Sequence, residues 1–204
     1  MKKIATLLFV YLGVQAAQAG ILIEPYLGYE VGAIKATLST AYSTALSVPD
    51  GTELAGKTEG TVLGARIGYT LPVLFWVALE PTMMTGKYKA SNTLTLDCDS
   101  SRTQLFIDAG VDFPILLRAW IGYGMTNEWS AKDLSGTAKY TGSATKVGVG
   151  FTGLPFVSIN LEYITHNFNK VTGLAGTVSD KVSDNFSSTT SASTVLSVSL
   201  PLDL

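Results

Sequence analysis

Apolar and polar residues alternate one by one through most of the sequence after residue 59, and this alternation restricts the fold more than any other feature. The last nine residues place five apolar side chains on one face and Ser197, Ser199, Pro201 and Asp203 on the other. Successive side chains of a β-strand point to opposite faces, so a period of two predicts strands. Helical periodicity is absent, and we expect no helix after the N-terminal segment. The sequence therefore predicts an all-β protein.

The N-terminal segment predicts export. Lys2 and Lys3 precede an apolar run over residues 4–14, and Ala17-Gln18-Ala19 follows it. This is the pattern of a cleaved secretory signal peptide. We expect residues 1–19 to be removed after Ala19 and residues 20–204 to form one domain. No later stretch reaches the roughly 18 apolar residues that a transmembrane helix requires.

Charge and cysteine content exclude several classes of protein. Without Lys2 and Lys3, 12 of the 14 basic residues remain, against 16 acidic residues. This mildly acidic balance, with no basic run, predicts no nucleic-acid partner. The single cysteine, Cys98, excludes an internal disulfide framework. Other interactions must hold the fold together.

The spacing of the alternating segments predicts a barrel. Short turns that contain proline lie near residues 71–73, 113–115 and 154–155, and long polar segments lie near 35–58, 89–100, 128–138 and 169–188. Short turns at one end and long loops at the other are the layout of bacterial outer-membrane barrels. We predict an eight-stranded antiparallel up-and-down transmembrane β-barrel, with ten strands as the alternative. The expected strands are 21–34, 59–71, 74–88, 101–113, 115–127, 139–153, 156–168 and 189–203.

Charged residues within the strands indicate which face is inside. Nearly all of them lie on the face opposite the apolar one, and an Arg or Lys facing lipid at the midplane would cost about 2–4 kcal/mol. A soluble lipocalin-type barrel would reverse the faces and leave an apolar lumen, so the charges favour the membrane barrel. We predict a structural polar network in the lumen, formed by Glu24, Arg66, Glu80, Asp108, Arg118, Lys146 and Glu162. Glu30 and Asp112 share this inward face.

Outward aromatic residues occur at two levels. Tyr69, Phe75, Phe113 and Phe151 lie within a few residues of the turns, whereas Tyr29, Tyr123 and Tyr163 lie farther along the strands. Aromatic side chains gather at the two interfaces of a bilayer. The two levels therefore predict two aromatic girdles.

Three motifs resemble those of small outer-membrane β-barrel proteins of the OmpA-like transmembrane and OmpX type. They are Glu24-Pro25-Tyr26-Leu27-Gly28-Tyr29, Gly64-Ala65-Arg66-Ile67-Gly68-Tyr69 and Trp76-Val77-Ala78-Leu79-Glu80-Pro81. The resemblance covers residues 20–204 and implies a bacterial outer-membrane location. It also implies outer-membrane lipids, the outer-membrane assembly machinery and periplasmic chaperones as partners. Leu204 stands where such barrels usually end in an aromatic residue that the assembly machinery recognises.

Two nucleotide-binding patterns occur in contexts that do not suit them. Residues 51–58 match a phosphate loop and residues 148–153 match a dinucleotide fingerprint. Both sites require a helix directly after the glycine-rich turn, but each of these stretches leads into a strand. We therefore expect no cofactor.

Catalytic and metal-binding residues are also scarce. His166 is the only histidine, and no Ser, His and acid occur in a recognisable arrangement. His166 is expected to point inward near the outer rim as a hydrogen-bonded lumen residue. Asp97-Cys98-Asp99 has too few oxygen ligands for a cation site and is expected to be a solvated loop. We predict no catalytic site, no bound metal and no enzymatic activity.

The leading hypothesis for function is a structural or surface-interaction role through four long outer loops, with an extracellular ligand possible at those loops. A small porin-like channel is the first alternative. An outer-membrane lipid-modifying enzyme that uses His166 is the second.

Overall fold

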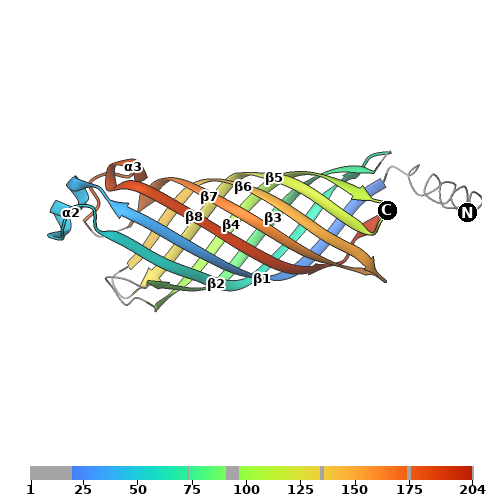
Figure 1. Cartoon of the computed structure of the whole chain (residues 1–204), viewed down its shortest axis with the longest axis horizontal. Coiled ribbons are helices and arrows are strands. Elements are labelled where there is room, and N and C mark those ends of the chain that lie inside the picture. The colour runs from blue at the N-terminus through green and yellow to red at the C-terminus, as the bar shows by residue number, and fades with distance from the viewer. Residues whose placement is uncertain (1–19, 73, 91–96, 134–135, 174–175, 204) are drawn as a thin grey trace, which may run out of the picture.

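The computed structural model describes residues 20–203, apart from 73, 91–96, 134–135 and 174–175. The predicted signal peptide and Leu204 lie outside the described residues. Eight long antiparallel strands form one closed ring, because β1 pairs with both β2 and β8. Figure 1 shows the strands inclined along a long tube. Their bounds are β1 Gly20–Leu38, β2 Glu53–Thr70, β3 Phe75–Ala90, β4 Asp97–Phe113, β5 Leu117–Asp133, β6 Gly136–Leu154, β7 Val157–Thr172 and β8 Phe186–Ser199.

The predicted eight-stranded up-and-down barrel is confirmed. A ninth strand, β9 (Leu202–Asp203), is only two residues long and pairs with Leu22 and Ile23 at the start of β1. It continues the course of β8 after a break at Leu200 and Pro201, where proline has no backbone N–H for the ladder. The predicted last strand, 189–203, is therefore interrupted, and it begins earlier than expected.

The three short turns lie where the prolines predicted them, at the end of the barrel where β1 begins and β8 ends (Figure 1). We call this the turn end and the opposite one the loop end. Among the described residues of these turns, one residue other than glycine in each lies in the left-handed region: Leu74 (φ 73°), Leu116 (φ 64°) and Phe156 (φ 67°). This conformation costs a residue with a Cβ roughly 1–2 kcal/mol, which the paired strands on either side must offset.

The strands extend farther toward the loop end than predicted. Much of the expected loop sequence is strand: residues 35–38 in β1, 53–58 in β2, 128–133 in β5 and 169–172 in β7. There the outward positions are mostly charged or polar, and several inward positions, such as Leu54 and Trp129, are apolar, so the apolar face changes from the outside to the inside of the barrel. Pairing of the backbone with its neighbours, rather than an apolar outer face, maintains these extensions.

The expectation of no helix is wrong at two short segments of the loop end, α2 (Thr40–Leu46) and α3 (Val182–Asn185). Ser39 caps α2, since its hydroxyl accepts a hydrogen bond from the Tyr42 N–H at 3.3 Å. Segments this short show no clear periodicity in the sequence. They form because each buries an anchor, Tyr42 in α2 and Val182 in α3. Among the described residues, no helix is long and apolar enough to cross a membrane.

The outer surface of the barrel has an apolar band. The outward aliphatic side chains and both predicted levels of aromatic residues are about half exposed. Beyond Tyr29, Tyr123 and Tyr163, the outward positions toward the loop end become charged: Lys35, Lys57, Glu59, Lys87, Lys89, Asp97, Asp99, Glu128, Lys132 and Lys139. The apolar band suits lipid and the charged positions suit water. The strands therefore project beyond the band at the loop end.

Candidate functional site

The seven residues of the predicted lumen network lie together inside the half of the barrel toward the turn end, and all are buried. Arg66 is at the centre of this charged layer. Its guanidinium contacts three carboxylates, with Nε 2.7 Å from Glu80, Nη2 2.9 Å from Glu162 and Nη1 3.2 Å from Glu24. A planar guanidinium with five donors can serve several carboxylates at once.

Lys146 and Arg118 complete the charged layer. The Lys146 ammonium lies 2.5 Å from Glu80 and 3.1 Å from Asp108. Arg118 lies 2.5 Å from Glu24 and, on its other side, 2.5 Å from the half-buried Asp112. Every cation of the layer therefore contacts at least two carboxylates. Buried charges that are paired in this way avoid the large cost of isolated ones.

Aromatic rings fill the space around the charged layer. The Arg66 guanidinium lies 4.4 Å from the centre of the Trp120 ring, and the Lys146 ammonium lies 4.4 Å from that of Phe106. Trp76 lies 6.2 Å from Trp120, measured between ring centres. A Cβ at Gly110 or Gly148 would overlap the indoles of Trp76 and Trp120, which explains glycine at these two inward positions. The lumen is therefore packed at this level.

A second polar group lies farther toward the loop end and includes His166. This side chain points inward and is buried, with Nε2 3.0 Å from the Ser193 hydroxyl and Nδ1 3.4 Å from the Gln104 amide nitrogen. Arg102 and Glu30 form a buried ion pair in the lumen. No described contact joins His166 to a carboxylate. A hydrogen-bonded lumen histidine accounts for this geometry.

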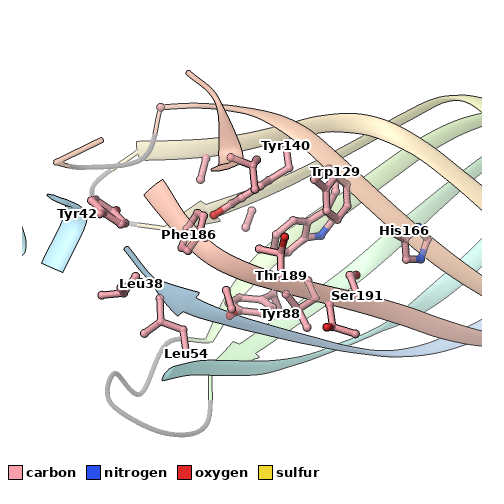
Figure 2. A pocket seen from close by; sticks show the side chains of 18 of the residues that line it. Leu38, Tyr42, Leu54, Tyr88, Trp129, Tyr140, His166, Phe186, Thr189 and Ser191 are labelled. Carbon is pink, nitrogen blue, oxygen red and sulfur yellow. The ribbon is translucent and has the colours of Figure 1, made fainter. Parts of the chain in front are cut away.

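A cavity of about 440 Å³ occupies the barrel interior at the loop end. Its walls are mainly aromatic and aliphatic, and they come from the inward positions of the strand extensions and from α2 and α3. In Figure 2, Leu38, Tyr42 and Phe186 lie toward the loop end, and Ser191 and His166 lie toward the interior of the barrel. We call this the loop-end cavity. Six aromatic side chains line it: Tyr42, Tyr88, Trp129, Tyr140, Phe168 and Phe186.

The register of the strands brings these aromatic side chains together. Trp129 and Tyr140 are direct partners across β5 and β6, and their ring centres are 5.1 Å apart. The Tyr88 ring is 5.3 Å from Trp129, and Phe168 is 5.7 Å from Tyr140. Edge and tilted contacts at these distances are favourable for aromatic pairs. The cluster gives the cavity a preformed apolar wall.

The wall of the barrel is incomplete beside this cavity. Pairing between β7 and β8 ends at His166 and Ser191, although β7 continues along β6 to Thr172 and β8 begins along β1 at Phe186. Beyond that last pair, the segment before α3 contacts β7, where the Val171 N–H donates to the Asp180 carbonyl. Exposed Asn167 and Thr190, whose inward-facing neighbours are His166 and Ser191, also line the cavity. The cavity therefore reaches the gap between β7 and β8.

Sequence reasoning missed the loop-end cavity. Tyr88, Tyr140 and Phe168 continue the inward parity of their strands, and this was a usable signal. Trp129 does not, because a register shift between Gly124 and Asn127 of β5 turns the odd-numbered residues inward. Trp129 was hidden because residues 128–138 were expected to be a loop. The contributions of Tyr42 and Phe186 depend on the tertiary structure, since both lie in segments predicted to be loops.

The residues of the other sequence motifs lie mainly in strands. Most of residues 51–58 form the start of β2, and residues 148–153 lie within β6, so neither stretch precedes a helix. Asp97, Cys98 and Asp99 begin β4 rather than lying in a loop, with Cys98 buried and both aspartates exposed. The Asp99 carboxylate contacts the Lys87 ammonium at 2.8 Å. Within the described ranges, no group of three or more His, Cys, Asp or Glu side chains could hold a metal ion.

Solved structures of outer-membrane proteins share this fold. Ail, the attachment invasion locus protein of Yersinia pestis, in complex with the heparin analogue sucrose octasulfate, gives a TM-score of 0.56 at 12% identity, over 90% of this chain and 99% of that one. The outer membrane protein AlkL in DMPC lipid bilayers gives 0.53 at 13% identity, over 92% of each chain. No protein family and no curated protein matches the sequence. The structural likeness establishes the fold of the small outer-membrane β-barrels.

Proposed function

We propose that this chain, which has the fold of a small outer-membrane β-barrel protein, binds a small and mainly apolar molecule in the loop-end cavity. The observation that carries the proposal is the cavity itself, with about 440 Å³ of space and six aromatic side chains in its wall. Binding sites for small molecules are typically concave, mostly apolar and roughly 300–1,000 Å³ in volume. The sequence predicted an interaction through the outer loops. In this proposal, the ligand binds in the loop-end cavity beneath those segments.

The position of the cavity supports binding of a ligand that comes from the outside of the cell. Tyr42 of α2 and Val182 of α3 both line it, so the segments between strands form part of its wall. The Tyr42 phenol is neutral at pH 7 even at its ordinary pKa of about 10, and burial raises that pKa further. A neutral aromatic wall favours an apolar ligand over an ion.

The two alternatives have less support. The charged layer and the rings around it fill the lumen, which disfavours a porin-like channel. His166 has Ser193 and Gln104 as its hydrogen-bond partners, which suits a structural role better than catalysis. We therefore propose a binding protein rather than a channel or an enzyme.

The test is binding of an apolar fluorescent probe, N-phenyl-1-naphthylamine, to the protein in lipid nanodiscs, with empty nanodiscs as the reference. We expect saturable binding above the reference. Ala138→Phe adds a ring at a half-buried position in the cavity wall and should weaken binding about tenfold, or about 1.4 kcal/mol.

The matched control is Thr137→Phe, which adds the same ring at the exposed position next to Ala138. It should leave the affinity unchanged within about twofold, which corresponds to less than 0.5 kcal/mol by the same relation. No saturable binding, or equal loss in both variants, would refute the proposal.

A further inference from the structure

We infer that the loop-end cavity accepts an uncharged amphiphile whose hydrogen-bond-accepting head group binds Trp129 and Ser191, while its apolar body packs against the aromatic wall. The inference rests on the proposed function and defines the class of ligand.

Two polar groups in the cavity wall lack a partner. Trp129 and Ser191 both line the cavity, and each side chain is only 4% exposed. Within the part of the chain that the structure describes, neither the Trp129 indole nitrogen nor the Ser191 hydroxyl makes a hydrogen bond. Buried polar groups are nearly always paired, and leaving them unpaired is costly. A ligand atom that pairs with them would be held firmly.

The position of these groups suggests how the ligand is oriented. In Figure 2, Ser191 and Trp129 lie on the side of the cavity toward His166, and Leu38, Tyr42 and Phe186 lie on the opposite side, toward the loops. The unpaired polar groups are therefore at the deep side, and Leu38, Tyr42 and Phe186 lie toward the loops (Figure 2). In this orientation the head group lies at the deep side, and the apolar body lies beneath α2 and α3.

The chemistry of the two groups determines the kind of head. The indole N–H can only donate a hydrogen bond, whereas a serine hydroxyl can donate and accept. A hydroxyl, carbonyl or ester oxygen on the ligand could accept from both. A head group with donors alone would leave the indole N–H unpaired.

The charge around the deep side argues against an ionised head. Arg102 and Glu30 are both buried and form an ion pair with each other, so their charges compensate. His166 is hydrogen-bonded to the Ser193 hydroxyl. Among the described residues that line the cavity, none is Asp, Glu, Lys or Arg. A carboxylate would therefore lose its hydration without gaining a counter-charge.

The experiment compares three ligands of equal chain length, 1-octanol, octane and octanoate, on the whole protein in nanodiscs. Dissociation constants come from displacement of N-phenyl-1-naphthylamine, corrected with empty nanodiscs for partition into lipid. We expect 1-octanol to bind about tenfold more tightly than either of the other two ligands. Trp129→Phe keeps a ring and removes the donor, and Ser191→Ala removes the hydroxyl. Each should reduce the affinity for 1-octanol about fivefold and leave that for octane unchanged.

A spectroscopic readout keeps the test independent of affinity. The chain has three tryptophans, and Trp120 donates its indole N–H to Glu162 at 2.9 Å in the charged layer. With 15N-labelled tryptophan, 1-octanol should shift the indole signal that Trp129→Phe removes, and octane should shift it less. Variants are compared only when they show the heat-dependent gel shift of the folded barrel.

The outcomes separate the two proposals. Equal affinity for 1-octanol and octane, with no effect of Trp129→Phe or Ser191→Ala, overturns the inference and leaves the apolar binding site intact. Tighter binding of octanoate also overturns it, in favour of an ionised head. Failure of the probe to bind at all would overturn the proposed function and, with it, this inference.

Discussion

Arg66 joins carboxylates from three strands in the interior of this barrel. Its guanidinium lies within 3.2 Å of Glu24, Glu80 and Glu162, which come from three different strands. The side chain is completely buried. Removal of the cation would leave three carboxylates with only Lys146 and Arg118 to compensate them.

We predict that Arg66→Met destabilises the folded barrel by about 3–5 kcal/mol, because breaking a buried ion pair leaves uncompensated charge. The measurement is the urea midpoint for unfolding in lipid vesicles, followed by the folded band on an unheated gel. The control is Lys87→Met, which removes an exposed ion pair with Asp99. Exposed pairs contribute little, so its midpoint should not move. Similar midpoints for the two variants would mean that the charged layer does not stabilise the barrel.

At the scale of elements, β7 and β8 differ from the other neighbouring strands. They pair only as far as His166 and Ser191, while the outer part of β8 keeps its pairing with β1 on its other side. The outer part of β1, by contrast, pairs with both β2 and β8. Residues 186–190 of β8 therefore have a ladder on one side only.

We predict that backbone amides of residues 186–190 exchange with deuterium at least about tenfold faster than those of residues 33–37, because amides outside a ladder open without breaking strand pairing. Hydrogen exchange read by mass spectrometry on the barrel in nanodiscs measures this. Residues 192–198 of β8, which are paired on both sides, serve as the internal control. Uniform protection along β8 would show that the seam is closed in the membrane.

At the scale of the whole molecule, the barrel is a tube closed in its middle and hollow near the loop end. Trp76, Phe106 and Arg66 are fully buried within the lumen, and eight strands leave an interior that side chains can fill. The loop-end cavity lies beyond this packed region. The molecule therefore has the loop-end cavity at one end and a closed lumen in its middle.

We predict that the purified protein gives no steady conductance in planar bilayers, because the charged layer and its aromatic neighbours leave no water-filled path. Single-channel recording at neutral pH measures this, with heat-unfolded protein as the negative control. Steady currents in the nanosiemens range would contradict the packed lumen.

Much of the fold could be predicted from the sequence because a membrane barrel imposes a strict pattern on each strand. The inward position of Glu80 and the outward position of Leu79 follow from parity and from the cost of charge in lipid. The proline turns were placed correctly for a similar reason, since proline cannot continue a strand ladder. These are local rules, and neighbouring residues are enough to apply them.

The candidate site could not be predicted in the same way. Tyr88 and Trp129 lie 41 positions apart in the sequence, and only the register of β3, β4 and β5 places their rings 5.3 Å from each other. Outside the lipid, the outer face of a strand no longer has to be apolar, so the pattern that identified the strands ends where the cavity is built.

The sequence by itself determined the strand count, the turn end, the lipid-facing side and the inward charges, because period-two alternation and the cost of charge in lipid act on each segment separately. Only the tertiary structure decided that Arg66 contacts three carboxylates, that β7 and β8 separate beyond His166 and Ser191, and that aromatic residues enclose a cavity at the loop end. The physical reason is that these features depend on strand register and ring closure, which bring together residues that are distant in the chain.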